Sequence, residues 1–566
     1  MKRIVSLDRD LCNTKKCGQE CRKACPVNRK GDECILVKDF AFVDESLCIG
    51  CGLCVRKCPF KALSVVNLPT ALNEEPIHRF GENQFALFRL PIPVKGVVGL
   101  LGANGVGKST ALKILSGQIT PNLGTVKSES ASHGMSDLIK LHRGSEMQDY
   151  LEKIEYGKIK VSYKPQNISA LSQLNKNVSD INIDEQLFSQ LGISACKGRN
   201  LSELSGGELQ RLAIGAAITK EADVYYFDEP TSYLDVQHRL DVAKTIRKLA
   251  EDRYVMVVEH DLATLDFLAD RIHIFYGKPG VFGVVSKPYS VKKGINAFLD
   301  GFIAEDNVRI REKTIFEKSA PEAIKKKNVF VSFSDVYKSY DNFELKVGSG
   351  ELHIGEVLGI FGPNALGKTT FARILAGELP FSGSIDKKIT VSYKPQYITT
   401  EFGGTLAELL KDADNNIIIK LALDKLMEKY VKNLSGGELQ RTAIALCISR
   451  DADLYLLDEP SAFLDVDQRL AVAKLLRSLA RSFAVVDHDL LFLSYLANRA
   501  MLFSGIPGKS GSAEFLSVEN GFNKFLRNIG VTFRLDPENK RPRANKPGSV
   551  QDREQMERNE YFFSSK

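Results

Sequence analysis

Nine of the eleven cysteines lie within the first 58 residues, and eight of these form two runs that each end in Cys-Pro. Three closely spaced thiolates can surround one iron–sulfur cube, while the cysteine before the proline points away and completes another cube. The spacing therefore predicts two [4Fe–4S] clusters with crossed ligands: Cys48, Cys51, Cys54 and Cys25 on one, and Cys12, Cys17, Cys21 and Cys58 on the other.

Other interpretations of these cysteines remain open. Zinc favours paired CxxC knuckles, and a disulfide framework requires export, whereas residues 1–6 lack the apolar core of a signal peptide. Cys34 belongs to neither run; we expect it to be structural, with ligation as the alternative. The isolated Cys196 and Cys447 are expected to be small buried side chains.

Two glycine-rich loops have the composition of phosphate-binding loops. Each follows an apolar strand-length run and precedes a helical pattern, which is the context that supports GxxxxGK(S/T). Backbone N–H groups would face the phosphates, the lysine would reach the β and γ phosphates, and the next hydroxyl would bind Mg²⁺. The predicted nucleotide ligands are Gly102, Asn104, Gly105, Gly107, Lys108, Ser109 and Thr110, and Gly362, Asn364, Gly367, Lys368, Thr369 and Thr370.

Two further apolar strands each end in a pair of carboxylates. The aspartate is predicted to hold Mg²⁺ and the glutamate to act as the catalytic base that polarises water. A glutamine after another strand would bind nucleotide and Mg²⁺, and a histidine after a fourth strand could contact the γ-phosphate. These residues are Asp228, Glu229, Gln166 and His260 in the first half, and Asp458, Glu459, Gln396 and His488 in the second.

The sequence LSGGELQR occurs twice, at 204–211 and at 434–441, which is an offset of 230 residues. The Lys-Pro-Gln and Asp-Glu-Pro motifs recur at the same offset, so the chain contains a module and its copy. Each LSGG is predicted to open a helix whose first N–H groups suit an anion. The residues concerned are Ser205, Gly206, Gly207, Ser435, Gly436 and Gly437.

The two modules are not identical. The lysine loops are 260 residues apart, so the first module has about 30 extra residues, which lie between Gly124 and Val161. Apolar residues at helical spacing over 137–142 and 147–154 predict a helix–loop–helix, either a tolerated surface insertion or a partner-docking element. Ala365 replaces a glycine of the first loop; if this position needs a positive φ, the second site is strained.

Aromatic side chains upstream of each loop are candidates to stack on adenine. Phe80 and Phe85 precede the first lysine and Phe343 the second, with core packing as the alternative for each. Glycine- and proline-rich stretches at 276–301 and 503–526 are predicted hinges. Lys540, Arg541, Arg543 and Lys546 form a basic cluster suited to a phosphate backbone, or else ordinary solvated surface.

The length and composition of the chain are those of an ordinary globular protein. Its 566 residues predict three or four domains, and a net charge of +7 permits a nucleic-acid partner without requiring one. No apolar run approaches membrane-spanning length, so we expect no membrane span. The predicted domains are 1–66 for the clusters, 67–295 for the first nucleotide module with its insertion at about 125–160, 296–327 for a hinge, 328–520 for the second module, and 521–566 for a second hinge and tail.

The combined motifs resemble those of ATP-binding cassette (ABC) ATPases. The resemblance implies an α/β fold with two ABC-type P-loop nucleotide-binding domains in tandem, behind a ferredoxin-like α+β domain. In that family two cassettes close head to tail over two ATPs. It therefore implies that Ser205 to Gly207 complete the ATP held by Lys368, and Ser435 to Gly437 the ATP held by Lys108.

Clusters, cassettes and insertion together resemble the RNase L inhibitor family, ABC subfamily E, over essentially the whole chain; Tyr561-Phe-Phe favours its eukaryotic branch. The resemblance implies a cytoplasmic monomer with an intramolecular cassette pair, leaving a nuclear pool open. It implies ATP-driven splitting of ribosomes, with links to termination and initiation. The implied partners are small-subunit rRNA and proteins and a release-type or stalled-ribosome factor, with initiation factors left open.

Two other functions remain alternatives at this point. One is a redox protein in which ATP turnover gates electron transfer through the clusters, since structural clusters and electron-transfer clusters use the same ligands. The other is the motor half of a transporter, which the expected lack of a membrane span disfavours.

Overall fold

The computed structural model describes residues 3–9, 11–67, 74–125, 134–314, 328–396 and 402–562. The chain forms two compact units. The first contains residues 1–230, 244–260 and 268–314, and the second contains residues 231–243, 261–267 and 315–566. The end of the predicted first hinge, part of the insertion and Phe563 lie outside the described residues.

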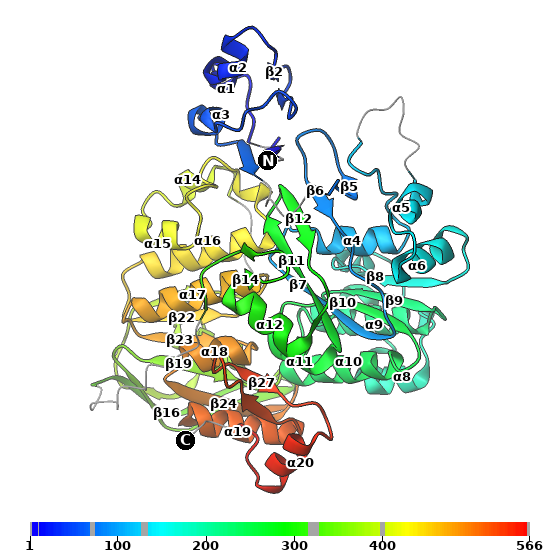
Figure 1. The fold of residues 1–566 in the computed structure, drawn as a ribbon. Coiled ribbons are helices and arrows are strands. Elements are labelled where there is room, and N and C mark those ends of the chain that lie inside the picture. Colours follow the sequence, from blue (N-terminus) through cyan, green and yellow to red (C-terminus); the bar gives the residue numbers. More distant parts are fainter. Residues whose placement is uncertain are drawn as a thin grey trace. The chain divides into compact units, whose positions relative to one another are not determined.

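The cysteine-rich domain, labelled by α1 to α3 in Figure 1, is an α+β fold built on two similar halves. Strand β1 pairs antiparallel with β4, and β2 with β3. Helices α1 and α3 each end at the cysteine that precedes a proline, Cys25 or Cys58, and both cysteines have extended backbones. The elements are β1 (Arg3–Leu7), α1 (Glu20–Ala24), α2 (Pro26–Arg29), β2 (Ile35–Val37), β3 (Ala41–Val43), α3 (Leu53–Lys57) and β4 (Leu63–Asn67).

The first cassette contains a parallel core and an antiparallel edge. Strands β8, β9 and β10 are parallel neighbours, and β7 pairs parallel with β11, which continues through β12 and β6 to β5. The strands are β5 (His78–Arg79), β6 (Ala86–Phe88), β7 (Gly96–Gly102), β8 (Val161–Lys164), β9 (Val224–Asp228), β10 (Tyr254–Val258), β11 (Arg271–Lys278), β12 (Phe282–Val285) and β13 (Tyr289–Ser290). Because β8, β9 and β10 run in parallel, the residues after them meet at one edge.

Helices flank this sheet, among them the phosphate-loop helix α4 and the LSGG helix α9 (Figure 1). The helices are α4 (Lys108–Leu115), α5 (Met135–Leu141), α6 (Glu146–Glu155), α7 (Ser169–Ser172), α8 (Glu185–Gln190), α9 (Gly206–Thr219), α10 (Val236–Leu249), α11 (Leu262–Leu268) and α12 (Val291–Asp300). A short pair of strands, β14 (Phe302–Ile303) and β15 (Val308–Arg309), follows.

The predicted helix–loop–helix is present as α5 and α6. Its apolar residues join the main core of the cassette, since Leu138, Met147 and Leu151 are buried in it. The hydroxyl oxygens of Tyr150 and Tyr226 lie within hydrogen-bond distance of each other, and at 3.0 and 3.2 Å from the carbonyl oxygen of Leu115. The insertion is thereby packed on the strand that leads to Asp228.

The second cassette has one ten-stranded sheet in which β24, β19, β23, β22 and β21 are parallel neighbours. Its strands are β16 (Val329–Tyr340), β17 (Phe343–Val347), β18 (Gly350–His353), β19 (Val357–Phe361), β20 (Ser382–Ile385), β21 (Val391–Lys394), β22 (Leu454–Asp458), β23 (Phe483–Val486), β24 (Arg499–Ile506) and β25 (Ser510–Ser517). Its helices are α13 (Lys368–Leu375), α14 (Leu406–Leu409), α15 (Asn415–Lys420), α16 (Gly436–Ser449), α17 (Val466–Ser478) and α18 (Leu490–Leu496).

The C-terminal segment corrects one prediction. It contains α19 (Val518–Ile529), β26 (Phe533–Leu535), β27 (Pro542–Ala544) and α20 (Val550–Glu557). Arg541 and Arg543 are buried, and both pair with Asp266, Arg543 at 2.9 Å. Only Lys540 and Lys546 of the predicted basic cluster are exposed. The two arginines are therefore ion-pair partners within the second unit and are not available to a phosphate backbone.

No helix among the described residues is long and apolar enough to cross a membrane.

Candidate active sites and cluster sites

Both lysine loops have the same conformation at the helix that they introduce. Gly107 and Gly367 precede α4 and α13 with φ of 93° and 92°. A Cβ on Gly107 would lie 2.8 Å from the ring of Phe85, so only glycine fits there. Lys108 Nζ donates to the carbonyls of Gly102 (2.8 Å) and Ala103 (2.7 Å). Lys368 makes the equivalent bonds, and burial lowers its pKa to about 8.

Ala365 does occupy a left-handed position. Its φ is 59°, beside 76° at Gly105 in the first loop. An alanine in this region costs about 1–2 kcal/mol relative to its usual conformations. The strain anticipated for the second loop is therefore present, and the loop keeps its shape in spite of it.

The hydroxyl after each lysine is bonded to the aspartate of the acidic pair. Thr369 Oγ1 donates to Asp458 Oδ2 at 2.8 Å, and Ser109 is hydrogen-bonded to Asp228. Burial raises the pKa of both aspartates, and these hydroxyl bonds oppose the rise. A hydroxyl and a carboxylate held together are hard oxygen ligands of the kind that Mg²⁺ prefers, so the residues present fit that ion.

The two glutamates are held in a strained conformation by buried side chains. Glu229 and Glu459 have φ of 47° and 48°, a region that costs energy for any residue with a Cβ. The carbonyl of Glu229 accepts bonds from Gln210 Nε2 (2.6 Å) and Lys164 Nζ (3.3 Å). Gln440 and Lys394 bind the Glu459 carbonyl with the same geometry.

These supporting residues were not predicted. Lys164 and Lys394 belong to the repeated Lys-Pro-Gln motif, and Gln210 and Gln440 to the repeated LSGGELQR. Repetition was therefore a signal that could have pointed to them. Their contact with the glutamate carbonyl depends on how α9 and α16 pack against neighbouring strands, which sequence spacing does not give.

The glutamate carboxylates face the predicted glutamine and histidine of the same cassette. Gln166 and Gln396 donate to Glu229 Oε1 (2.6 Å) and Glu459 Oε1 (2.8 Å). The Nε2 atoms of the buried His260 and His488 lie 3.5 and 3.7 Å from the same oxygens.

Electrostatics suit the second glutamate to accept a proton. Burial, and then the negative charges of Asp458 and Asp487, raises the pKa of Glu459 to about 7. Burial also lowers the pKa of His488 well below its usual value, so that imidazole is neutral. A carboxylate with a pKa near neutral pH is well matched to general-base catalysis.

The LSGG serines are helix N-caps. Ser205 caps α9 and Ser435 caps α16, each in a capping box with the glutamate three residues later. Glu208 Oε2 accepts from the N–H and the hydroxyl of Ser205, both at 2.8 Å. Each glycine pair forms the first turn of a 14-residue helix, whose free N–H groups and dipole favour an anion.

Within the second unit, one residue that follows the first Asp-Glu-Pro motif contacts the second phosphate loop. Asp235 Oδ2 accepts from the N–H of Asn364 at 2.9 Å. Asp235 is buried and also binds His238, and the hydrogen bond and charge of His238 overcome burial to hold its pKa well below the usual range.

The aromatic candidates fall into two classes. Phe85 and Phe343 pack on the loop glycines Gly107 and Gly367. Phe80 is exposed, and its ring centroid lies 6.4 Å from that of Phe85. Tyr340, which we did not predict, is exposed and lies 6.5 Å from Phe343. Tyr340 precedes Lys368 by the 28 residues that separate Phe80 from Lys108, so the offset could have revealed it.

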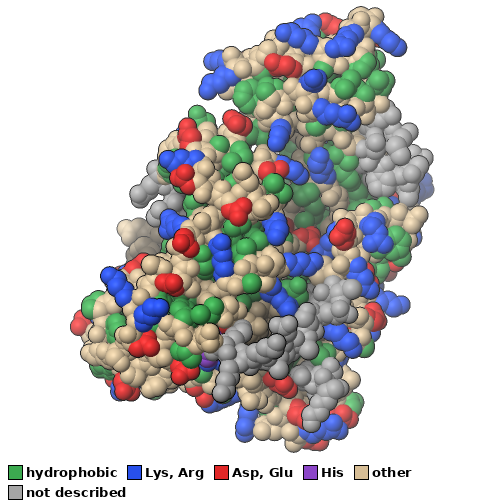
Figure 2. All heavy atoms as spheres, turned by 90° about the vertical axis from the view of Figure 1, so that its left-hand side faces the viewer, with side chains coloured by type: hydrophobic (Ala, Val, Ile, Leu, Met, Phe, Trp, Pro, Cys, Tyr) green, Lys and Arg blue, Asp and Glu red, His purple; other side chains and the backbone are tan. Residues whose placement is uncertain are grey.

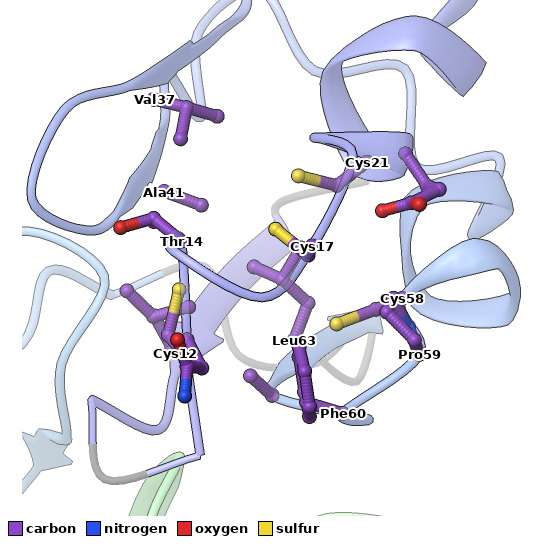
Figure 3. A pocket seen from close by; sticks show the side chains of 14 residues that line it. Cys12, Thr14, Cys17, Cys21, Val37, Ala41, Cys58, Pro59, Phe60 and Leu63 are labelled. Atoms are coloured by element: carbon purple, nitrogen blue, oxygen red, sulfur yellow. The ribbon is translucent and has the colours of Figure 1, made fainter.

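Four cysteines from both runs surround one pocket in the N-terminal domain. Figure 3 shows the sulfur atoms of Cys12, Cys17, Cys21 and Cys58 turned toward a common space, which Leu7, Val37 and Leu63 also line. Cys58 comes from the second run and the other three from the first. Four thiols around an apolar pocket fit a cubane cluster, so the donor set agrees with the crossed arrangement.

The remaining predicted ligands do not line this pocket. Cys54 interacts with Cys48 and Cys51, and Cys25 and Cys48 both interact with Cys34. Burial and these neighbouring thiols raise the pKa of Cys34 to about 12. No group of three or more His, Cys, Asp or Glu in the described part of the chain is close enough to hold a single metal ion.

Known proteins resemble the chain along its whole length. An uncharacterized ABC transporter ATP-binding protein of Methanocaldococcus jannaschii is 47% identical and the translation initiation factor RLI1 of Saccharomyces cerevisiae 42%, each over 99% of this chain and 97% or 98% of that protein. A solved structure described as a model of ribosome-bound archaeal Pelota and ABCE1 has 45% identity and a TM-score of 0.93, covering 100% of this chain and 99% of that one. The higher identity to the archaeal protein does not support the eukaryotic branch favoured by the C-terminus.

Family models match the same segments that carry the motifs. Residues 88–232 and 345–462 match the model described as ABC transporter, residues 41–64 the 4Fe-4S binding domain, and residues 3–33 the possible Fer4-like domain in RNase L inhibitor, RLI. The chain is thus an ABC-type ATPase with an N-terminal [4Fe–4S]-binding domain. Because its relatives share 42–47% identity over nearly the full length, it belongs to the RNase L inhibitor family.

Proposed function

We propose that this chain is an ATP-driven ribosome-recycling factor, in which closure of two cassettes over two ATPs splits the ribosomal subunits. The observation that carries the proposal is full-length similarity to a structure whose description names ribosome-bound Pelota and ABCE1. Two complete sets of ATPase residues in one chain support it, since a monomer could then form its own cassette pair.

At each site we assign binding to the phosphate loop and the base to the glutamate. Lys108 and Lys368 hold the β and γ phosphates, and the loop N–H groups bind the remaining oxygens. Glu229 and Glu459 take the proton of the attacking water, oriented by the glutamine of the same cassette. His260 and His488 would contact the γ-phosphate, which their burial beside the glutamates supports.

We further propose Mg²⁺ and two [4Fe–4S] clusters as cofactors. Ser109 with Asp228 and Thr369 with Asp458 would hold the magnesium, assisted by the glutamines; the ion supplies charge neutralisation at the phosphates. The eight predicted cysteines would hold the clusters in two crossed sets, whose binding would also contribute to the stability of this small domain.

Each ATP would be completed by the LSGG helix of the opposite cassette. The capped N-termini of α9 and α16 support this role, because their first N–H groups suit a γ-phosphate. Exposed Phe80 and Tyr340 would stack on adenine, with Phe85 and Phe343 packed behind them. Hydrolysis would then release the opposite cassette and allow reopening.

The proposed partners are the ribosome, small-subunit rRNA and protein, and a release-type factor, in the cytoplasm. The basic side chains of the cluster domain support a polyanionic partner: residues 1–66 contain 13 lysines and arginines against 8 aspartates and glutamates, a net charge of +5 before the clusters and their thiolates are counted. In Figure 2 the basic side chains are spread over this domain at the top of the view. Initiation factors, a nuclear pool and docking through α5 and α6 are further parts of the proposal.

The direct test is sedimentation with ribosomes in sucrose gradients, with and without a non-hydrolysable ATP analogue. We expect the analogue to shift the chain onto small subunits and the double variant Glu229→Gln, Glu459→Gln to stay bound with ATP alone. If neither condition moves the chain from the top of the gradient, ribosome recycling is excluded. A reversible cluster potential that controls ATP turnover would instead favour the redox alternative.

A further inference from the structure

Tyr163 lies on β8, directly before Lys164, and its hydroxyl reaches the acidic pair of the first cassette. The hydroxyl donates to Oδ2 of Asp228 at 3.2 Å. The tyrosine ring packs against the main core of the cassette. Because β8 and β9 are parallel neighbours and β9 ends at Asp228, the side chain of Tyr163 approaches the carboxylate from the adjacent strand.

The two oxygens of the Asp228 carboxylate have different surroundings. Oδ2 accepts the bond from Tyr163, whereas Oδ1 is buried and has no hydrogen-bond donor within the part of the chain that the structure describes. A buried polar atom without a partner costs free energy, and more so when it is charged. A magnesium ion, or a water molecule bound to it, would satisfy that oxygen. The bond from Tyr163 therefore occupies one oxygen and leaves the other to serve the ion.

The second cassette repeats this arrangement. Tyr393 pairs with Leu456 on the neighbouring strand, two residues before Asp458, just as Tyr163 pairs with the residue two before Asp228. The hydroxyl of Tyr393 is hydrogen-bonded to Asp458. Both tyrosines belong to the sequence VSYKPQ, at 161–166 and 391–396. Phenylalanine would pack equally well at this position, so the repeated bond to the carboxylate indicates a role for the hydroxyl itself.

We propose that Tyr163 and Tyr393 are positioning residues for magnesium. Each hydroxyl holds one oxygen of the aspartate, which turns the other oxygen toward the ion or toward a water molecule bound to it. The tyrosine acts through the aspartate and does not itself bind the ion. The inference rests on the proposed magnesium sites at Asp228 and Asp458. Loss of a group that hydrogen-bonds a metal-binding carboxylate typically lowers metal affinity by about 10–100-fold.

The test separates magnesium binding from nucleotide binding at the first site. The parent is the full-length chain with Gly367→Ala, which should empty the second site because the added Cβ would lie 3.0 Å from the ring of Phe343. Calorimetric titration with a non-hydrolysable ATP analogue is performed in excess Mg²⁺ and in EDTA. Adding Tyr163→Phe should weaken binding about tenfold in Mg²⁺ and leave binding in EDTA unchanged. Unchanged affinity in Mg²⁺, or an equal loss in both conditions, would overturn the proposal.

Tyr226→Phe in the same parent is the matched control. It removes a buried tyrosine hydroxyl from the neighbouring strand, where the hydroxyl lies within hydrogen-bond distance of Tyr150 and of the Leu115 carbonyl. Both affinities should stay unchanged, and a magnesium-specific loss as large as that of Tyr163→Phe would contradict the assigned role. If Mg²⁺ does not strengthen binding to the parent, the magnesium assignment itself fails, and the proposal with it.

The second site provides an independent repetition. Tyr393→Phe, in a chain whose first site is emptied by Gly107→Ala, should show the same loss in Mg²⁺ and none in EDTA. A loss at the first site alone would overturn the role of Tyr393.

Discussion

The second active site should be sensitive to pH through Glu459. Hydrolysis by the second site alone can be measured in Glu229→Gln, which removes the base of the first site. With a pKa of about 7, roughly nine tenths of Glu459 is ionised at pH 8 and about one tenth at pH 6. Because only the ionised form can accept a proton, the rate at saturating ATP and excess Mg²⁺ should fall about tenfold between these values.

The negative charge of Asp487 allows a second test of this prediction. Asp487 raises the pKa of Glu459 and also binds the N–H and hydroxyl of Ser461, at 3.0 and 2.7 Å. Asp487→Asn removes the charge and keeps one acceptor oxygen, so the loss of activity should move to lower pH. Glu229→Gln combined with Glu459→Gln gives the baseline. A second site that hydrolyses ATP equally fast at pH 6 and pH 8 would refute the assignment of Glu459 as a buried base.

Three other perturbations test particular contacts. Asp266→Ala should lower the free energy of unfolding by about 3–5 kcal/mol, because it leaves the buried Arg541 without its ion-pair partner and removes one of the two carboxylates that pair with Arg543; Asp300→Ala, at a half-exposed ion pair, should barely move the melting temperature, and equal shifts would contradict this account. Tyr340→Ala should weaken ATP binding at the second site by about 1–3 kcal/mol, from lost stacking on the base; in titrations of a chain that also carries Gly107→Ala, unchanged affinity would remove Tyr340 from the site. Gly107→Ala should abolish ATP binding at the first site, whereas Gly105→Ala, whose Cβ would meet nothing nearer than 3.4 Å, should retain it; the reverse order would show that the loop conformation is misassigned.

The local motifs were the predictable part of the fold and the sites. A phosphate loop, a capped LSGG helix and an acidic pair at a strand end each depend on residues that are close in sequence. The insertion was visible because two offsets disagreed, and α5 and α6 lie where the apolar spacing placed them. Tyr340 lies as far before Lys368 as Phe80 lies before Lys108, but we did not predict it.

The rest depended on contacts between distant segments. The prediction of a basic cluster was wrong because Arg541 and Arg543, at strand β27, are buried against Asp266 of helix α11, whose position no local pattern indicates. The carbonyl of the left-handed Glu229 is bound by Lys164 from strand β8 and by Gln210 from helix α9. Such bonds are set by packing: repetition singles out Lys164 and Gln210 in the sequence, but it does not show which group they bind.

The pairing of Arg541 with Asp266 also affects the order in which contacts can form while the chain is being translated. The two residues are 275 positions apart, so a ribosome adding about 5–20 residues each second makes the arginine roughly tens of seconds after the aspartate. Helix α11 can form early, yet the carboxylate of Asp266 gains its buried partner only after residue 541 has been made. A chain released before residue 541 would leave that carboxylate unpaired and this contact unmade. Helix α11 can therefore make this ion pair only after residues 541–543 have been translated.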